Sequence, residues 1–157
     1  CLPEEVLRLK SSAPELPDSY LHVLSQLSLH RKGLLGIELS PGPARLSYID
    51  QIIFQSRTPF SRDSGFCAIG HKDADLILLQ KSSALAEGGQ ISILICDSNR
   101  EAHFLAPSFM DFFFICANLE ERFPDRGVPS RADECTKILE SFGASGAFTI
   151  WEYLINS

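Results

Sequence analysis

The chain has 157 residues, 45% of them hydrophobic, which suits one ordinary domain with a substantial core and argues against disorder. Its net charge of −6 argues against direct nucleic-acid binding, because such binding depends mainly on neutralising phosphates. No apolar run approaches the roughly 18 residues of a membrane-spanning helix, and no signal peptide is visible. Together with five scattered cysteines, these features predict a cytoplasmic protein.

Two helices are expected first. Residues 3–10 carry a short helical pattern through Val6 and Leu9. The stretch LPDSYLHVLSQL (16–27) predicts a longer helix, because Pro17 suits the first helical position and Asp18 lies at the positive end of the helix dipole. Its apolar residues recur at the spacing of one helical face: Tyr20, Val23, Leu24 and Leu27.

Short apolar runs separated by turn residues then predict an antiparallel meander. GLLGIEL (33–39) suggests a strand, ARLSYIDQIIF (44–54) a short strand or a helical turn, and residues 55–65 a polar connector. Strong strand patterns follow at 66–70, 75–82 and 91–97, with HKDA (71–74) and Gly88-Gly89 as turns between them, and 103–106 is a short final strand.

A helical period returns after Pro107. Ser108 and Asp111 have capping-box spacing, and Phe114 lies off the main apolar face, available to pack on a second surface. The main apolar face, which is expected to point inward, comprises Phe109, Phe112, Phe113, Cys116 and Leu119. Another helix begins near Ser130-x-x-Asp133, turns Cys135, Ile138, Leu139 and Phe142 inward, and stops at Gly143. The tail, 144–157, fits a strand or a helix equally well.

The order of elements predicts one α+β domain, with an antiparallel sheet of about four to six strands packed by N-terminal and C-terminal helices. Catalytic motifs are absent from it: there is no G-x-S-x-G, P-loop or H-E-x-x-H sequence. Cys67 with His71, or Cys96 with His103, would be the candidate dyads or zinc ligands. Both cysteines lie in apolar strands without paired ligand spacing, which favours buried thiols. We therefore predict no catalytic residue, no metal and no cofactor.

Four carboxylates form the candidate partner-binding site. Asp73 and Asp75 precede one predicted strand, and Asp97 and Glu101 follow the next. In an antiparallel hairpin the start of one strand lies beside the end of the other, so all four are expected at one end of the sheet. Turn positions are solvated, so turn formation and solubility would account for these residues. The alternative is an acidic edge that binds a basic protein.

A longer order of motifs runs through these elements. Its residues are Leu16, Pro17 and Tyr20; Phe66, Ile69 and Gly70; Asp75, Leu76 and Leu78; Gly89, Ile91 and Ile93; and Ser108, Phe109 and Phe112. Over about residues 3–120, this order resembles the SUKH superfamily of Smi/Knr-like cell-wall regulators and bacterial immunity proteins. A Gly-Asp pair that is frequent in the family is replaced here by Ala74-Asp75.

The resemblance implies a domain that binds other proteins and, in bacteria, one that neutralises a toxin, often a nuclease. Residues 1–157 would then form a single SUKH-like domain, with 1–15 as a helical lead-in and 123–157 as a C-terminal extension. The expected partner is a cognate toxin or another protein, without nucleic acid or membrane, and the chain would be a monomer or weak homodimer. The alternative is a regulatory or scaffolding domain in a cellular pathway.

Overall fold

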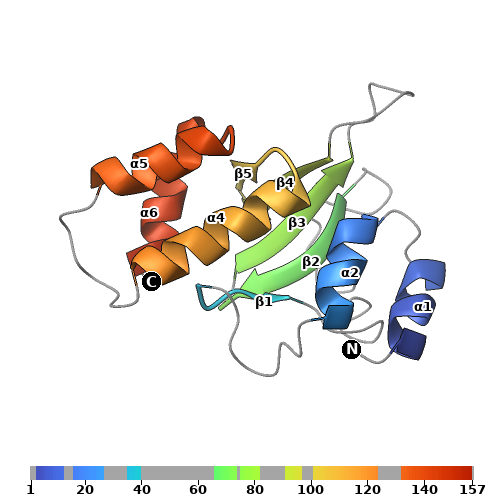
Figure 1. Ribbon diagram of the computed structural model, residues 1–157. Coiled ribbons are helices and arrows are strands. Elements are labelled where there is room, and N and C mark those ends of the chain that lie inside the picture. Colours follow the sequence, from blue (N-terminus) through green and yellow to red (C-terminus); the bar gives the residue numbers. More distant parts are fainter. Residues whose placement is uncertain are drawn as a thin grey trace.

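An antiparallel sheet with helices packed on one face organises the chain (Figure 1). The computed structural model describes residues 3–12, 16–26, 35–39, 66–73, 75–81, 91–96, 101–123 and 132–156. The elements are α1 (Pro3–Ser12), α2 (Asp18–Gln26), β1 (Glu38–Leu39), β2 (Phe66–Lys72), β3 (Asp75–Lys81), β4 (Ile91–Cys96), β5 (Ala102–Ala106), α4 (Phe109–Arg122), α5 (Ala132–Ser141), η2 (Ser145–Ala147) and α6 (Phe148–Asn156). They form a single α+β domain, as the sequence predicts.

Strands β2 to β5 form a four-stranded antiparallel meander, and the two-residue β1 pairs with the free edge of β2. Lys72 pairs with Asp75, so β2 continues through His71 and Lys72 into the segment predicted as a turn. Asp73 has a φ of +50°, a left-handed conformation that aspartate tolerates better than most residues. The turn between β2 and β3 is therefore tighter than the HKDA pattern suggested.

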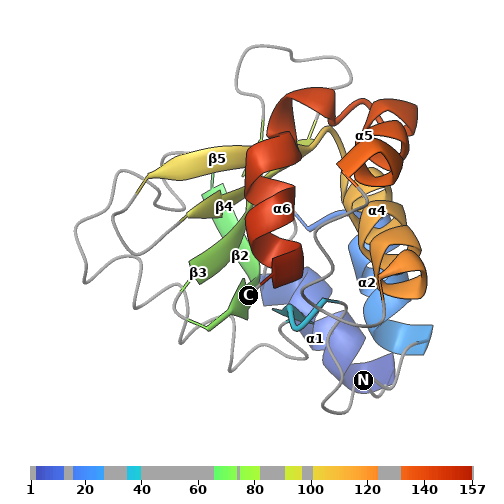
Figure 2. The same cartoon turned by 90° about the vertical axis from the view of Figure 1, so that its left-hand side faces the viewer.

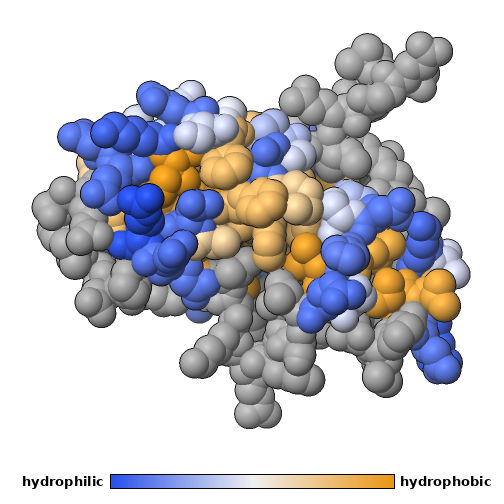
Figure 3. Space-filling view, in the orientation of Figure 1, coloured by the Kyte–Doolittle hydropathy of each residue, from blue (hydrophilic) through white to orange (hydrophobic). Residues whose placement is uncertain are grey.

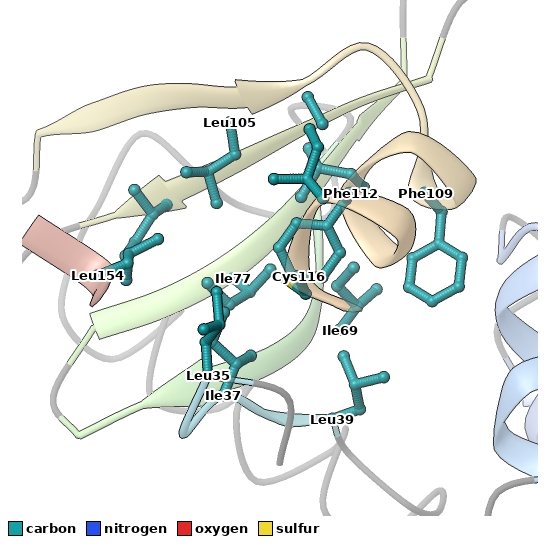
Figure 4. Packing of buried hydrophobic residues seen from close by; sticks show 14 of the residues in the cluster. Leu35, Ile37, Leu39, Ile69, Ile77, Leu105, Phe109, Phe112, Cys116 and Leu154 are labelled. Carbon is teal, nitrogen blue, oxygen red and sulfur yellow. The ribbon is translucent and has the colours of Figure 1, made fainter. Parts of the chain in front are cut away.

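The two faces of the sheet differ in what covers them. Helices α2, α4 and α6 lie on the same side of the sheet (Figure 2). Beneath them, alternate strand residues are fully buried: Ile69, Ile77, Leu79, Ile93, Ile95 and Leu105. Figure 4 shows Phe112 and Cys116 of α4 next to Ile69 and Ile77. The opposite face carries a smaller cluster of Leu78 and Cys96, with Phe66 and Leu76 packed against it.

Helix α2 is joined to the sheet by its buried tyrosine. The hydroxyl of Tyr20 donates a hydrogen bond of 3.0 Å to the backbone oxygen of Ile69 in β2. The Tyr20 ring also meets Phe109 edge to face, with ring centroids 5.1 Å apart. Val23 and Leu24 are buried beside it, which confirms the predicted apolar stripe within the described part of α2.

Helix α4 begins where the capping-box spacing placed its start. The backbone N–H of Asp111 donates to Oγ of Ser108 at 3.1 Å, which satisfies a donor of the first turn that would otherwise lack a helical partner. Of the predicted inward face, Phe113 is only half-buried. The other four residues are buried, together with Ile115.

The segment predicted as an extension belongs to the main core. The tail is helical, with Trp151 fully buried and its Nε1 donating to the backbone oxygen of Leu105 at 2.9 Å. Cys135 and Leu139 of α5 join the same core, which confirms the inward face of that helix. Gly143 follows α5 with a φ of +68°, as expected of a helix stop.

Several sequence predictions lie outside the described residues. These are the patterns over 44–54 and 55–65, the Gly88-Gly89 turn, the start of α5 at Ser130, and Asp97 of the candidate site. Within the described ranges, no helix combines the length and the apolar character needed to cross a membrane.

Candidate functional site

Three of the four predicted carboxylates gather at one end of the sheet. The register pairs Leu76 with Cys96 and Cys96 with Ala102. Asp75 precedes Leu76 and Glu101 precedes Ala102, so both lie at the end where Asp73 turns the chain. Asp73 and Glu101 are exposed there. The structure therefore brings three of the four predicted carboxylates to one end of the sheet, and the fourth, Asp97, lies outside the described residues.

Asp75 is not part of the solvated surface. It is only 7% exposed, and the hydroxyl of Tyr153 in α6 donates to its Oδ2 at 3.3 Å. Asp75 lies two residues before Ile77, on the side of the sheet that the helices cover. The expectation of a solvated turn residue is thus wrong for Asp75, and the strand period of two was the signal that predicts its burial. Its partner Tyr153 is 52% exposed, so this ring is part of the surface at the acidic end.

A buried lysine lies beside this end of the sheet. Nζ of Lys72 donates to the backbone oxygens of Leu35, at 3.0 Å, and of Leu154. Leu154 lies in the last turn of α6, where carbonyl groups lack helical partners and a positive charge is favourable. Lys72 thus connects β2, the turn before β1 and the end of α6. Sequence analysis missed this role, since the lysine occurs in what reads as a polar turn.

The described cysteines are buried thiols. Cys96, Cys116 and Cys135 are buried and are not in disulfide bonds. Burial raises the pKa of the Cys116 thiol well above its usual range, with a further rise from the charge of Glu120. Burial, and then the charge of Glu152, raises the pKa of Cys135 to about 11. Thiols held in the protonated form are poor nucleophiles at neutral pH.

One candidate dyad is contradicted by the register. His103 pairs with Ile95, whereas Cys96 pairs with Ala102, so Cys96 and His103 occupy opposite faces of the sheet. The side chain of Cys67, the cysteine of the other candidate dyad, lies outside the described part of the molecule. Among the residues that are described, no three His, Cys, Asp or Glu side chains gather in a way that could hold a metal ion.

The outward side of α4 forms an apolar surface. Phe114 is 44% exposed, and its ring stacks on Phe142, the residue that follows α5, with centroids 6.1 Å apart and planes 15° apart. Met110, Phe113 and Ala117 are its neighbours along the helix and are half-buried, and Met110 and Phe113 also pack against the main core. We call these five residues the α4 aromatic face. Figure 3, in the orientation of Figure 1, shows a continuous apolar area where α4 crosses the molecule, with hydrophilic areas on both sides.

Two carboxylates lie beyond the α4 aromatic face, at the C-terminal end of α4. Glu120 and Glu121 are exposed in its last turns, beside the exposed Arg122. Glu121 follows Ala117 by four residues, so it continues the outward side of the helix. The sequence indicated part of this arrangement, because Phe114 lies off the inward stripe. The stacking on Phe142 could not be read from it, since the relative placement of α4 and α5 has no local signature.

The fold and these surfaces define a single α+β domain with an apolar helix face and an acidic sheet end. Neither a protein-family model, nor a curated protein, nor a solved structure matches the chain.

Proposed function

We propose that the chain is a non-enzymatic protein-binding domain, and that it acts as an immunity protein that neutralises a cognate toxin by direct binding. The observation that carries the proposal is the α4 aromatic face. A large aromatic ring that is 44% exposed beside further apolar side chains is typical of a surface that a protein partner covers. Burying an apolar side chain of this size contributes roughly 1.5–3 kcal/mol, so such a face can supply a central contact for binding.

The acidic character of the chain supports a basic partner. The net charge is −6, and Asp73 and Glu101 are exposed together at one end of the sheet. A toxin that cuts nucleic acid needs a basic surface to bind phosphates. Opposite charges on the two proteins accelerate their association and orient the encounter. The resemblance to the SUKH superfamily points to the same function.

Growth under toxin expression tests this proposal. The full chain is expressed together with any toxin whose gene neighbours its own, in cells that the toxin alone prevents from growing. We expect growth to be restored and the two purified proteins to form a stable complex. Growth arrest that persists at saturating levels of the folded chain would contradict the immunity function. Binding to a non-toxic protein of a cellular pathway would instead support the regulatory alternative.

A further inference from the structure

We propose that the α4 aromatic face binds an amphipathic α-helix of the partner protein, with an apolar stripe along its length and a Lys or Arg beside Glu121. The inference rests on the proposed function, since it names the structural element and the chemistry by which the partner binds. The spacing of residues on α4, the shape of the face and its charge each support it.

The spacing of the outward residues matches helix–helix packing. Met110, Phe114, Ala117 and Glu121 follow one another at intervals of four, three and four residues. This is the interval pattern by which two helices pack side by side at a small crossing angle. The inward side of α4 has its own row, which is buried in the core. Within the described residues, Phe142 stacks on Phe114 in the outward row and leaves Phe114 44% exposed, so this part of the row can still contact a partner.

The shape of the face also suits a helix. Phe114 is 44% exposed, and its stacking on Phe142 restricts the ring before any partner arrives. A contact that is ordered in advance loses less conformational entropy on binding. Ala117, next in the outward row, has a small side chain, which permits the backbone of a second helix to come close. A protruding ring beside a small residue gives a knob and an adjacent space for a side chain of the partner.

Charge favours a different protein over a second copy of this chain. Glu121 ends the apolar row, with Glu120 beside it, so a helix lying along the row gains from a basic residue at that position. In an antiparallel pair of two copies, Glu121 would meet the end of α4 that carries Met110 and Asp111. In a parallel pair it would meet Glu121 of the other copy. Both arrangements place a carboxylate against apolar atoms or a like charge, which costs free energy.

A designed peptide tests the proposal. The probe is a labelled peptide of about 20 residues, long enough to form a helix, with Leu and Ala in the apolar stripe and Lys at one end. Its binding to the full chain is measured by fluorescence anisotropy, beside a peptide of the same composition in scrambled order. We expect the ordered peptide to bind at least about tenfold more tightly than the scrambled one. Equal affinity of the two peptides would overturn the proposal.

Variants with matched controls locate the binding face. Phe114→Ser should weaken binding of the ordered peptide about tenfold. Phe104→Ser, at a ring that is 39% exposed on β5, should leave binding unchanged. Ala117→Gln adds bulk without charge and gives an independent test if Phe114→Ser fails to fold. Unchanged binding by a folded Phe114→Ser or Ala117→Gln protein would overturn the proposal.

A charge exchange tests the position of the basic residue. Glu121→Lys should weaken binding of the Lys peptide and strengthen binding of the same peptide with Glu in place of Lys. Glu4→Lys, at an exposed carboxylate of α1, should produce no such exchange of preference. If Glu121→Lys leaves both affinities unchanged, the assigned orientation is wrong.

Sedimentation tests whether a second copy of this chain, instead of a different protein, covers the α4 aromatic face. A dimer of the wild-type chain that Phe114→Ser abolishes would assign the face to a second copy and overturn the proposal. The growth assay distinguishes this inference from the proposed function. Toxin neutralisation without peptide binding would reject the helical partner and retain the immunity function. Peptide binding without neutralisation would retain the helical partner and reject the immunity function.

Discussion

Lys72 carries a positive charge into the interior where three segments of the chain meet. It is 4% exposed and donates to the backbone oxygens of Leu35 and Leu154, and its charge acts on the thiol of Cys116 in α4. Leu35 has a φ of +55°, in the left-handed region, so the turn that presents its oxygen is a constrained one. At the scale of the single residue, this lysine stabilises the junction by donating hydrogen bonds to carbonyl groups of two other segments.

Replacing Lys72 tests this role. Lys72→Met keeps much of the side-chain length and removes the donors, so we expect the free energy of unfolding to fall by about 1–3 kcal/mol. The control is Lys10→Met, because Lys10 forms a surface ion pair with Asp18 at 2.6 Å between two exposed side chains. Such pairs contribute about 0–1 kcal/mol. If urea unfolding shows the same small loss of unfolding free energy in both variants, the buried hydrogen bonds of Lys72 do not stabilise this junction.

The buried thiols predict a loss of stability at alkaline pH. The thiol of Cys135 has a pKa of 9.0 without the protein environment and about 11 in the folded chain. Between these values the folded state keeps a proton that the unfolded state has lost, so the free energy of unfolding should fall as pH rises through this range. In the Cys116→Ala and Cys135→Ala double variant, the free energy of unfolding should fall less steeply with pH than in the wild-type chain, as measured by urea unfolding. An identical slope would mean that these thiols do not cause it.

Single residues of the candidate site were only partly predictable. The register that gathers Asp73, Asp75 and Glu101 follows from the hairpin pattern, and the structure reproduces it. The burial of Asp75 follows from strand alternation, but its neighbour Tyr153 comes from a helix 78 positions away in sequence. No local pattern reports such a contact.

At the scale of the element, α4 has two sides with different roles. Phe112 is 1% exposed and packs with Trp151 at a ring distance of 5.9 Å, whereas Phe114 is 44% exposed. Phe112→Ala should therefore lower the free energy of unfolding by about 3–5 kcal/mol. Phe114→Ala should cost less than about 1 kcal/mol, in line with an exposed position. Leu24→Ala in α2 should resemble Phe112→Ala, and equal costs for the two phenylalanine variants would contradict the assigned orientation of α4.

Helices and strands with a clear period were predictable, and α6 was not. The stretch AFTIWEYLI (147–155), which contains most of α6, has β-branched and aromatic residues that suit a strand and a spacing that suits a helix. Contacts made elsewhere favour the helix: Trp151 donates to the backbone of β5, and Lys72 binds the carbonyl of Leu154. Tertiary contacts of this kind override weak local preference.

At the scale of the whole molecule, the acidic sheet end should control how fast a basic partner associates. Asp73→Asn combined with Glu101→Lys should slow association with the proposed toxin partner and reduce its dependence on salt. Thermal stability should not fall, because asparagine tolerates the left-handed conformation of residue 73. Asp75→Lys differs, because it places a second positive charge in the buried region beside Lys72, and it should destabilise the fold. Stopped-flow association at low and high salt measures the effect. An unchanged rate for the exposed double variant at low salt would exclude this edge from the encounter.

The α4 aromatic face is central to the proposed binding, and the affinity of the purified proposed toxin partner for two matched phenylalanine variants tests it most directly. Phe114→Ser and Phe104→Ser remove rings of similar exposure from different surfaces of the same domain. Calorimetric titration with the full chain should show affinity reduced about tenfold or more by Phe114→Ser, a loss of about 1.4 kcal/mol, and unchanged by Phe104→Ser. Wild-type affinity in a folded Phe114→Ser protein would contradict the account.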